Sequence, residues 1–182
     1  MKRLFCSVRT VSAAVLLVLA GCSPGFDLST LQADPSAPDS AEASRSIYAG
    51  RTFITQDPFH GTQIEYHGPN GKSALWYPGN SRTVPANWKI RFDGPERGHD
   101  VCWQYPSRSY NPVTGQSGGR FECTPDWLYF PGVVQIVQGD PFELASGRVP
   151  FPLPKGEYTA EELAKAAGIP DSRIRTVYRD DQ

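Results

Sequence analysis

Cysteine and histidine are the residues of this 182-residue chain whose chemistry could define a site. They stand at Cys6, Cys22, Cys102, Cys123, His60, His67 and His99. Metal ligands on one strand or helix lie two or four residues apart, whereas His60 and His67 are seven apart. No two cysteines have the Cys-x-x-Cys spacing of zinc and redox sites. We therefore expect no metal and no cofactor, and we expect His67, beside a turn, at the surface.

Carboxylates and hydroxyls show no catalytic pattern either. Five carboxylates lie near predicted turns or strands: Glu65, Asp93, Glu96, Asp100 and Glu122. Nothing in their spacing pairs two of them for acid–base chemistry, and a solvated surface position explains them more simply. The chain also lacks the Gly-x-Ser-x-Gly turn of many hydrolases and a Gly-rich phosphate loop. We predict that the protein is not an enzyme.

The amino-terminal segment has the organisation of a secretory signal. Three basic residues, Lys2, Arg3 and Arg9, precede an almost wholly apolar run at residues 11–20. That run is about half the length that a membrane-spanning helix needs, so a permanent transmembrane helix is disfavoured. The run ends in Leu19-Ala20-Gly21-Cys22, which resembles the lipobox of bacterial lipoproteins.

The lipoprotein resemblance implies a fate for Cys22. Cleavage would remove residues 1–21, and the thiol of Cys22 would carry a diacylglyceryl group, with a further acyl chain such as palmitate on the freed amino group. Several acyl chains give stable membrane anchoring. Ser23 follows the cysteine, and by the same resemblance it implies the outer membrane, with the protein facing the periplasm. Ordinary secretion, with Cys22 left as a free thiol, is the alternative.

The remaining cysteines form an even pair once Cys6 leaves with the signal and Cys22 is lipidated. In an oxidising compartment the default expectation is a disulfide between Cys102 and Cys123, with Cα atoms about 5–6 Å apart. It would close a loop of about 20 residues and stabilise the fold by about 3 kcal/mol in the chain-entropy model. A metal site formed by the two cysteines is the alternative, although no histidine lies at a spacing from them that is typical of metal ligands.

Charge argues against one class of partner. The signal takes three of the 18 basic residues and none of the 19 acidic ones. The mature chain therefore carries a net charge of about −4 with histidine neutral. A protein without a basic surplus lacks the electrostatic attraction that nucleic-acid binding requires, so we expect no nucleic-acid partner.

Composition divides the mature chain into two parts. Residues 22–45 are rich in Ser, Ala, Asp and Pro, which predicts a lipidated cysteine and a flexible tether with a typical span of about 25 Å. Residues 46–182 predict a globular domain. Its expected strands lie at residues 47–54, 62–67, 72–77, 87–92, 100–105, 120–124, 127–130 and 133–137. A turn at Asn70-Gly71 makes the second and third of these a hairpin.

The fold class follows from these short strands and their Gly/Pro turns. We predict a mainly β domain, a small antiparallel barrel or sandwich, with one short C-terminal helix at about residues 160–167. Thr159 and Glu162 form a capping box at the start of that helix, and Gly168 ends it. Residues 173–178 would follow as a last strand or an extended tail.

Aromatic residues are dense in this domain, and they suit either a β core or a binding face. We name as a candidate binding surface Trp76, Tyr77, Trp103, Tyr105 and Tyr110. Residues 50–137 resemble uncharacterised β domains of proteobacterial envelope proteins in the Asn70-Gly71 turn, the strand with Trp88, the Val-Cys-Trp at residues 101–103 and the cysteine at 123. That resemblance implies a compact, disulfide-closed β domain and no activity.

The expected function is a structural or interaction role in the bacterial cell envelope. The protein would be held to the membrane through the lipid on Cys22 and would meet an envelope protein or a glycan. The alternative is a periplasmic carrier, a β-barrel whose aromatic-lined cavity binds a small ligand or a glycan.

Overall fold

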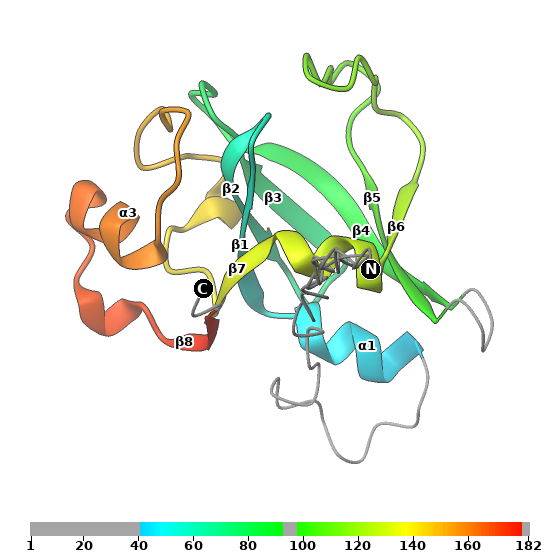
Figure 1. Ribbon diagram of the computed structural model, residues 1–182, viewed down its shortest axis with the longest axis horizontal. Coiled ribbons are helices and arrows are strands. Elements are labelled where there is room, and N and C mark those ends of the chain that lie inside the picture. The colour runs from blue at the N-terminus through cyan, green and yellow to red at the C-terminus, as the bar shows by residue number, and fades with distance from the viewer. Residues whose placement is uncertain (1–40, 93–97, 180–182) are drawn as a thin grey trace, which may run out of the picture.

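One antiparallel sheet dominates residues 41–92 and 98–179, the part of the chain that the computed structural model describes (Figure 1). Its strands are β1 (Arg51–Asp57), β2 (Gly61–His67), β3 (Lys72–Trp76), β4 (Val84–Phe92), β5 (His99–Gln104), β6 (Glu122–Pro125), β7 (Val133–Gln138) and β8 (Thr176–Arg179). Their order across the sheet is β6-β5-β4-β3-β2-β1-β7-β8. The α-helices of these ranges are α1 (Ala41–Tyr48), α2 (Asp126–Tyr129) and α3 (Ala160–Ala167). Short 3-10 turns are η2 (Phe130–Gly132), η3 (Leu144–Ser146) and η4 (Asp171–Arg173).

The prediction of a mainly β domain is confirmed, and two of its details are confirmed with it. β2 and β3 form the expected hairpin, in which His67 lies opposite Ser73 across the turn. α3 occupies the expected residues, and its capping box forms as the sequence indicated. The Thr159 hydroxyl accepts from the backbone N–H of Glu162, whose carboxylate accepts from the backbone N–H of Thr159.

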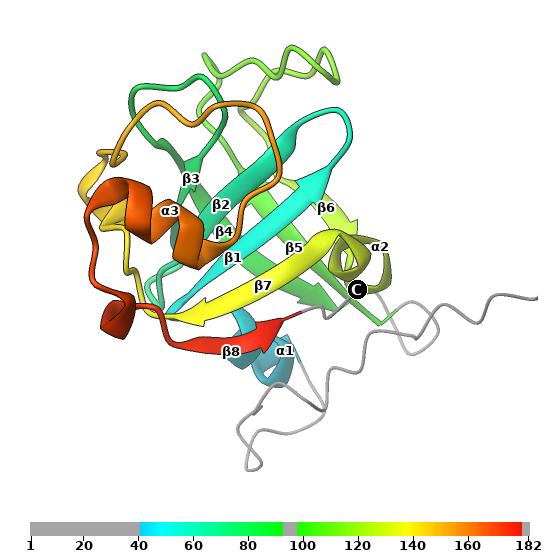
Figure 2. The same ribbon diagram turned by 60° about the vertical axis from the view of Figure 1, so that its left-hand side comes forward.

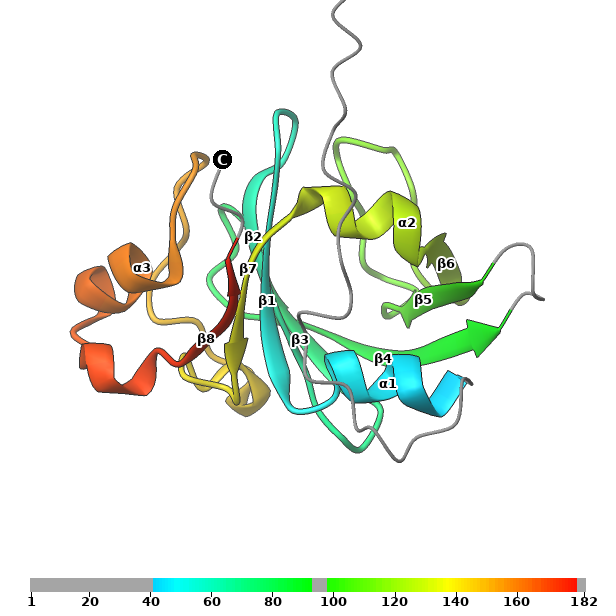
Figure 3. The same cartoon turned by 60° about the horizontal axis from the view of Figure 1, so that its bottom comes forward.

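The sheet curls into an open half-barrel (Figure 3). Side chains from β1, β4, β5 and β7 pack together with α1 and η2 in an inner core: Ile47, Tyr48, Phe53, Trp88, Val101, Trp103, Phe130, Val133 and Ile136. In a flat sheet with neighbouring strands about 4.8 Å apart, β5 and β7 would lie roughly 24 Å from one another. Their shared core therefore requires the sheet to curve toward this face, and α1 and α2 close it (Figure 3).

The convex face has a core of its own. Its buried members, the outer core, are Ile54, Ile64, Ala74, Trp76, Val137, Phe142, Leu144, Leu153, Ala160, Leu163 and Ala164. Most of the covering residues come from the segment between β7 and β8, including α3, which lies over β1 and β7 (Figure 2). Alternation along each strand sends successive side chains to opposite faces, so both faces of the sheet are filled.

One predicted strand is wrong in part and another is wrong entirely, because helices take their place. Residues 47 and 48, expected in the first strand, belong to α1, where Ser44, Ile47 and Tyr48 are buried at helical spacing. Gly50 then adopts φ +72° and turns the chain into β1. Residues 127–130 form α2 and the start of η2, because Pro125 (φ −56°, ψ 139°) ends β6 and cannot donate to a further strand pairing.

The predicted disulfide is present between Cys102 of β5 and Cys123 of β6. The two residues lie directly opposite one another in the ladder. Their Cα atoms are 4.0 Å apart, closer than the 5–6 Å expected from disulfides in general. Directly opposed residues of antiparallel strands lie about 4.5–5.5 Å apart, so their position in the ladder favours a short Cα distance.

Candidate functional site

Two ionisable residues of β2 point into the concave face. Glu65 and His67 are separated by one residue, so the strand places both on the inner side of the sheet. The Glu65 residue is 7% exposed and His67 is fully buried. The prediction that His67 lies at the surface is therefore wrong: α1 and the long side chains of β4 and β5 cover the turn beside it.

Hydrogen bonds satisfy the Glu65 carboxyl inside this core. Ser73 donates its hydroxyl to Oε1 at 2.7 Å, and the Tyr105 hydroxyl lies 3.3 Å from both carboxyl oxygens. These donors lower the pKa of Glu65, but burial raises it by more, to about 7. The group is therefore divided between its acid and carboxylate forms near neutral pH.

Aromatic rings surround the His67 imidazole. Trp103 donates its indole N–H to Nε2 at 3.1 Å, and the rings of Tyr48, Phe53 and Trp88 stand nearly perpendicular to it at 5.1–5.4 Å between centroids. Burial lowers the pKa of His67 to about 3, so the ring is neutral. Because Nε2 accepts a hydrogen bond, the proton lies on Nδ1, which has no partner among the described residues. With no exposed surface, His67 has no access to a substrate.

Another buried acid, Asp126, joins the two helices of the concave side. The Tyr48 hydroxyl, at the end of α1, donates to Oδ1 of Asp126, the first residue of α2, at 2.7 Å. Burial raises the pKa of Asp126 to about 6, although the Tyr48 bond works in the opposite direction. The contact fixes α2 against α1.

One surface pocket opens beside this cluster. It has a volume of about 370 Å³ and is lined by Lys72, Pro85, Ala86, Asn87, Gln104, Tyr105, Pro106, Ser107 and Gly119. Polar side chains form a row along it: Lys72 Nζ donates to Asn87 at 2.7 Å, and Asn87 donates to Gln104 at 3.0 Å. Tyr105 contributes both to the pocket and to the bond with Glu65, so it stands between the pocket and the buried acid.

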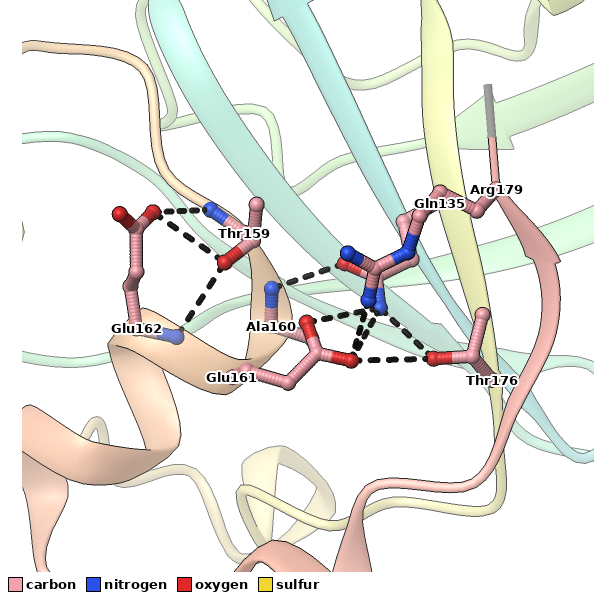
Figure 4. Close-up of polar contacts among 7 residues, drawn as sticks. All are labelled: Gln135, Thr159, Ala160, Glu161, Glu162, Thr176 and Arg179. Carbon is pink, nitrogen blue, oxygen red and sulfur yellow. Dashed lines mark hydrogen bonds and ion pairs between the residues drawn. The ribbon is translucent and has the colours of Figure 1, made fainter. Parts of the chain in front are cut away.

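A second pocket, of about 450 Å³, lies between β7, β8 and the start of α3. Figure 4 shows the polar network at its edge, in which Glu161 of α3 receives hydrogen bonds from Gln135 of β7 and Thr176 of β8. Arg179 of β8 forms an ion pair with the same carboxylate (Figure 4). Gln135 is 2% exposed, and its carbonyl accepts from the backbone N–H of Ala160 at 2.9 Å. The network joins α3 and β8 to the sheet, which is a structural role.

The residues named as a candidate binding surface do not meet on one face. Trp76 lies in the outer core and Trp103 in the inner core, and neither forms a surface. Tyr77 is half-buried, with its hydroxyl 2.9 Å from Nδ1 of His60. Tyr105 is half-buried at its pocket, and Tyr110 alone of the five is exposed. Cys22 lies outside the described residues.

Sequence reasoning missed the most exposed apolar pair of the described chain. Trp127 and Leu128 follow one another on α2 and are 70% and 58% exposed. The expectation of a strand there implied that one of the two would face the core. In a one-turn helix whose ends are buried, both project outward.

Other kinds of site find no support in the described residues. They contain no group of three or more His, Cys, Asp or Glu side chains placed to hold a metal ion. None of their helices combines the length and the apolar character needed to span a bilayer. Comparisons with family models, with curated proteins and with solved structures find no match to this chain.

Proposed function

We propose that this chain is a lipid-anchored protein of the bacterial cell envelope, facing the periplasm from the outer membrane, with a non-catalytic interaction role. The lipobox-like Leu19-Ala20-Gly21-Cys22 and Ser23 support the anchor and its place. The Cys102–Cys123 disulfide accords with an oxidising compartment.

The observation that carries the interaction role is the filled interior. Trp76, Trp88 and Trp103 are at most 9% exposed, and they pack both faces of the sheet. The perturbed acid and histidine of the concave face, Glu65 and His67, lie in that packing and do not line an open cleft. This arrangement favours contact through the outer surface over catalysis or transport of a ligand in the barrel.

Replacing Cys22 tests the anchor. The Cys22→Ala protein should lose incorporation of an alkyne-labelled palmitate and should leave the membrane fraction for the soluble periplasmic fraction. Cys6→Ala is the matched control, because it removes a thiol from the same segment and should change neither result. Membrane association of the Cys22→Ala protein at the parent level would refute the anchor.

The interaction role needs a separate test in the anchored form. A photo-crosslinking residue at exposed Tyr110 should give discrete crosslinked bands in intact cells, and the same residue at buried Trp76 should give none. Only uncrosslinked protein at every exposed position tried would contradict a partner.

A second candidate function, binding of a glycan or another small polar ligand, is supported by the pocket beside Tyr105. Its row of Lys72, Asn87 and Gln104 offers the amide and ammonium groups that bind sugar hydroxyls, next to an aromatic ring. Titration with chitotetraose, followed by NMR, should shift the side-chain amide signals of Asn87 and Gln104. Unchanged signals at millimolar sugar would remove chitin-type glycans from consideration.

A further inference from the structure

Trp127 is exposed, together with its neighbour Leu128, whereas the other three tryptophans are buried. The other three tryptophans are 0%, 2% and 9% exposed, whereas Trp127 is 70% exposed with Leu128 beside it. Two adjacent large apolar side chains left in water on a helix fixed at both ends form a contiguous patch, which is typical of interaction sites, whereas single exposed apolar residues are common.

The exposure is imposed by the flanking residues of α2. Asp126 is buried and bonded to Tyr48, and Tyr129 packs its ring 5.1 Å from that of Trp103. Phe130, next along the chain, is 2% exposed. Because the residues on both sides are fixed in the core, the helix cannot rotate Trp127 and Leu128 inward.

The same pair lies on a helix that is bonded to α1, the helix at which the described residues begin. The bond between Tyr48 and Asp126 ties the end of α1 to the start of α2. α1 rises about 1.5 Å per residue, so Ala41 lies about 10 Å from Tyr48. Both helices close the concave side of the sheet (Figure 3). If residues 23–40 form the flexible tether expected from their composition, their typical span is about 23 Å, and a lipid on Cys22 would hold this side within reach of the bilayer.

We propose that Trp127 and Leu128 insert into the headgroup region of the membrane that holds the lipid on Cys22, and so orient the domain on the bilayer. This inference rests on the proposed lipid anchor. Tryptophan favours the membrane interface, where its ring meets apolar chains and its N–H meets water. A protein that is already anchored needs little additional apolar contact to adopt one orientation, because its surface stays close to the lipid.

Tryptophan fluorescence tests the insertion, because Trp127 is the exposed tryptophan of the four. Lipidated mature protein, beginning at Cys22, in phosphatidylethanolamine–phosphatidylglycerol vesicles should lose at least a third of its emission when the lipids carry bromine on their acyl chains. Acrylamide quenching should fall by at least twofold relative to detergent-free Cys22→Ala protein in buffer. Trp127→Phe should abolish both changes, since the three buried tryptophans remain.

A relocated tryptophan provides the matched control for orientation. Phe59, in the β1–β2 turn, is 71% exposed, and the seven residues of β1 separate it from the α1 end of the sheet. Combining Phe59→Trp with Trp127→Phe should give a tryptophan that brominated lipid does not quench and acrylamide does. Equal bromine quenching at both positions would show that the domain has no preferred orientation, and would overturn the proposal.

Vesicle flotation separates the two hypotheses. Protein that does not float with vesicles refutes the anchor itself. Protein that floats while Trp127 stays unquenched by bromine and open to acrylamide refutes the insertion alone. Protection from acrylamide without bromine quenching would mean that a protein surface covers Trp127, and it would also overturn the insertion.

Discussion

Glu65 and His67 lie on the same face of one strand, yet burial shifts their pKa values in opposite directions. Burial favours the neutral form of each: the pKa of Glu65 rises to about 7 and that of His67 falls to about 3. Folding therefore favours proton binding at Glu65 and proton release at His67. Between about pH 4.5 and 6.5 these two effects on stability oppose each other.

Replacing Glu65 should reveal its contribution to the pH dependence of the free energy of unfolding. Above its unfolded pKa of 4.5, the native state binds more protons at Glu65 than the unfolded state does, so this group lowers the free energy of unfolding as pH rises to about 7. From pH 4.5 to 7, the parent should therefore lose about 3 kcal/mol relative to Glu65→Gln. Urea unfolding at both pH values measures the difference.

Glu157→Gln is the control for that experiment, because its carboxyl is exposed. If the offset of Glu65→Gln from the parent is the same at pH 4.5 and 7, Glu65 titrates alike in both states.

For single residues, the sequence predicted which cysteines bond to one another but not which side chains are buried. The Cys102–Cys123 pair followed from counting thiols. The burial of His67 did not, because its partner Trp103 is 36 residues away and Tyr48 reaches it from α1. A residue beside a turn is exposed only when no other element covers that turn, and alternation along one strand carries no information about such a cover.

The helices and strands that local sequence specifies were predicted, and those that depend on distant contacts were not. The β2–β3 hairpin and α3 were predicted because a turn dipeptide and a capping box specify them locally. α2 was predicted as a strand because the four residues Asp126–Tyr129 are too few to show helical periodicity. Its position depends on the bond from Asp126 to Tyr48, which joins residues 78 apart.

Gln135 connects β7 to the start of α3 and should be needed for that junction. In Gln135→Leu, the Ala160 N–H loses its acceptor and Glu161 loses one donor, while the side-chain volume is nearly kept. We expect a loss of about 2 kcal/mol in the free energy of unfolding, together with faster hydrogen exchange in α3. Chemical denaturation and exchange mass spectrometry measure the two effects.

Gln138→Leu on the same strand is the matched substitution, because no side-chain hydrogen bond of Gln138 is seen in the described residues. It should leave α3 exchange unchanged. If both substitutions accelerate exchange equally, the buried amide of Gln135 is not what holds the helix.

For the whole molecule, the composition predicted a β domain behind a polar tether. In the structure, helical packing begins earlier in the chain than the predicted start of the domain at residue 46. The tether was expected to run to residue 45, but α1 begins at Ala41 and buries Ser44 and Ile47. The strand order was not predictable, because β1 lies between β2 and β7, and nothing local to β1 specifies a partner 78 to 87 residues away.

Limited proteolysis should locate the boundary between tether and domain. A nonspecific protease such as proteinase K should cut residues 23–40 within minutes and stop before α1, leaving a stable fragment that begins near Ala41. Mass spectrometry of the fragment gives its first residue. A stable fragment beginning near 46 would show that α1 opens readily, and protection of residues 23–40 would contradict a tether.

The place of β7 next to β1 also sets an order of assembly. During synthesis, which starts at the amino terminus, β1 to β6 can pair before β7 is made, so one edge of β1 still has no neighbour. The outer face of Ile54, Ile64 and Trp76 stays bare until residues beyond 140 arrive to cover it. Nascent chains at this stage present both a free strand edge and an apolar surface, the two features that promote aggregation. A truncation before β7 should thus depend on chaperones, even though it retains six of the eight strands.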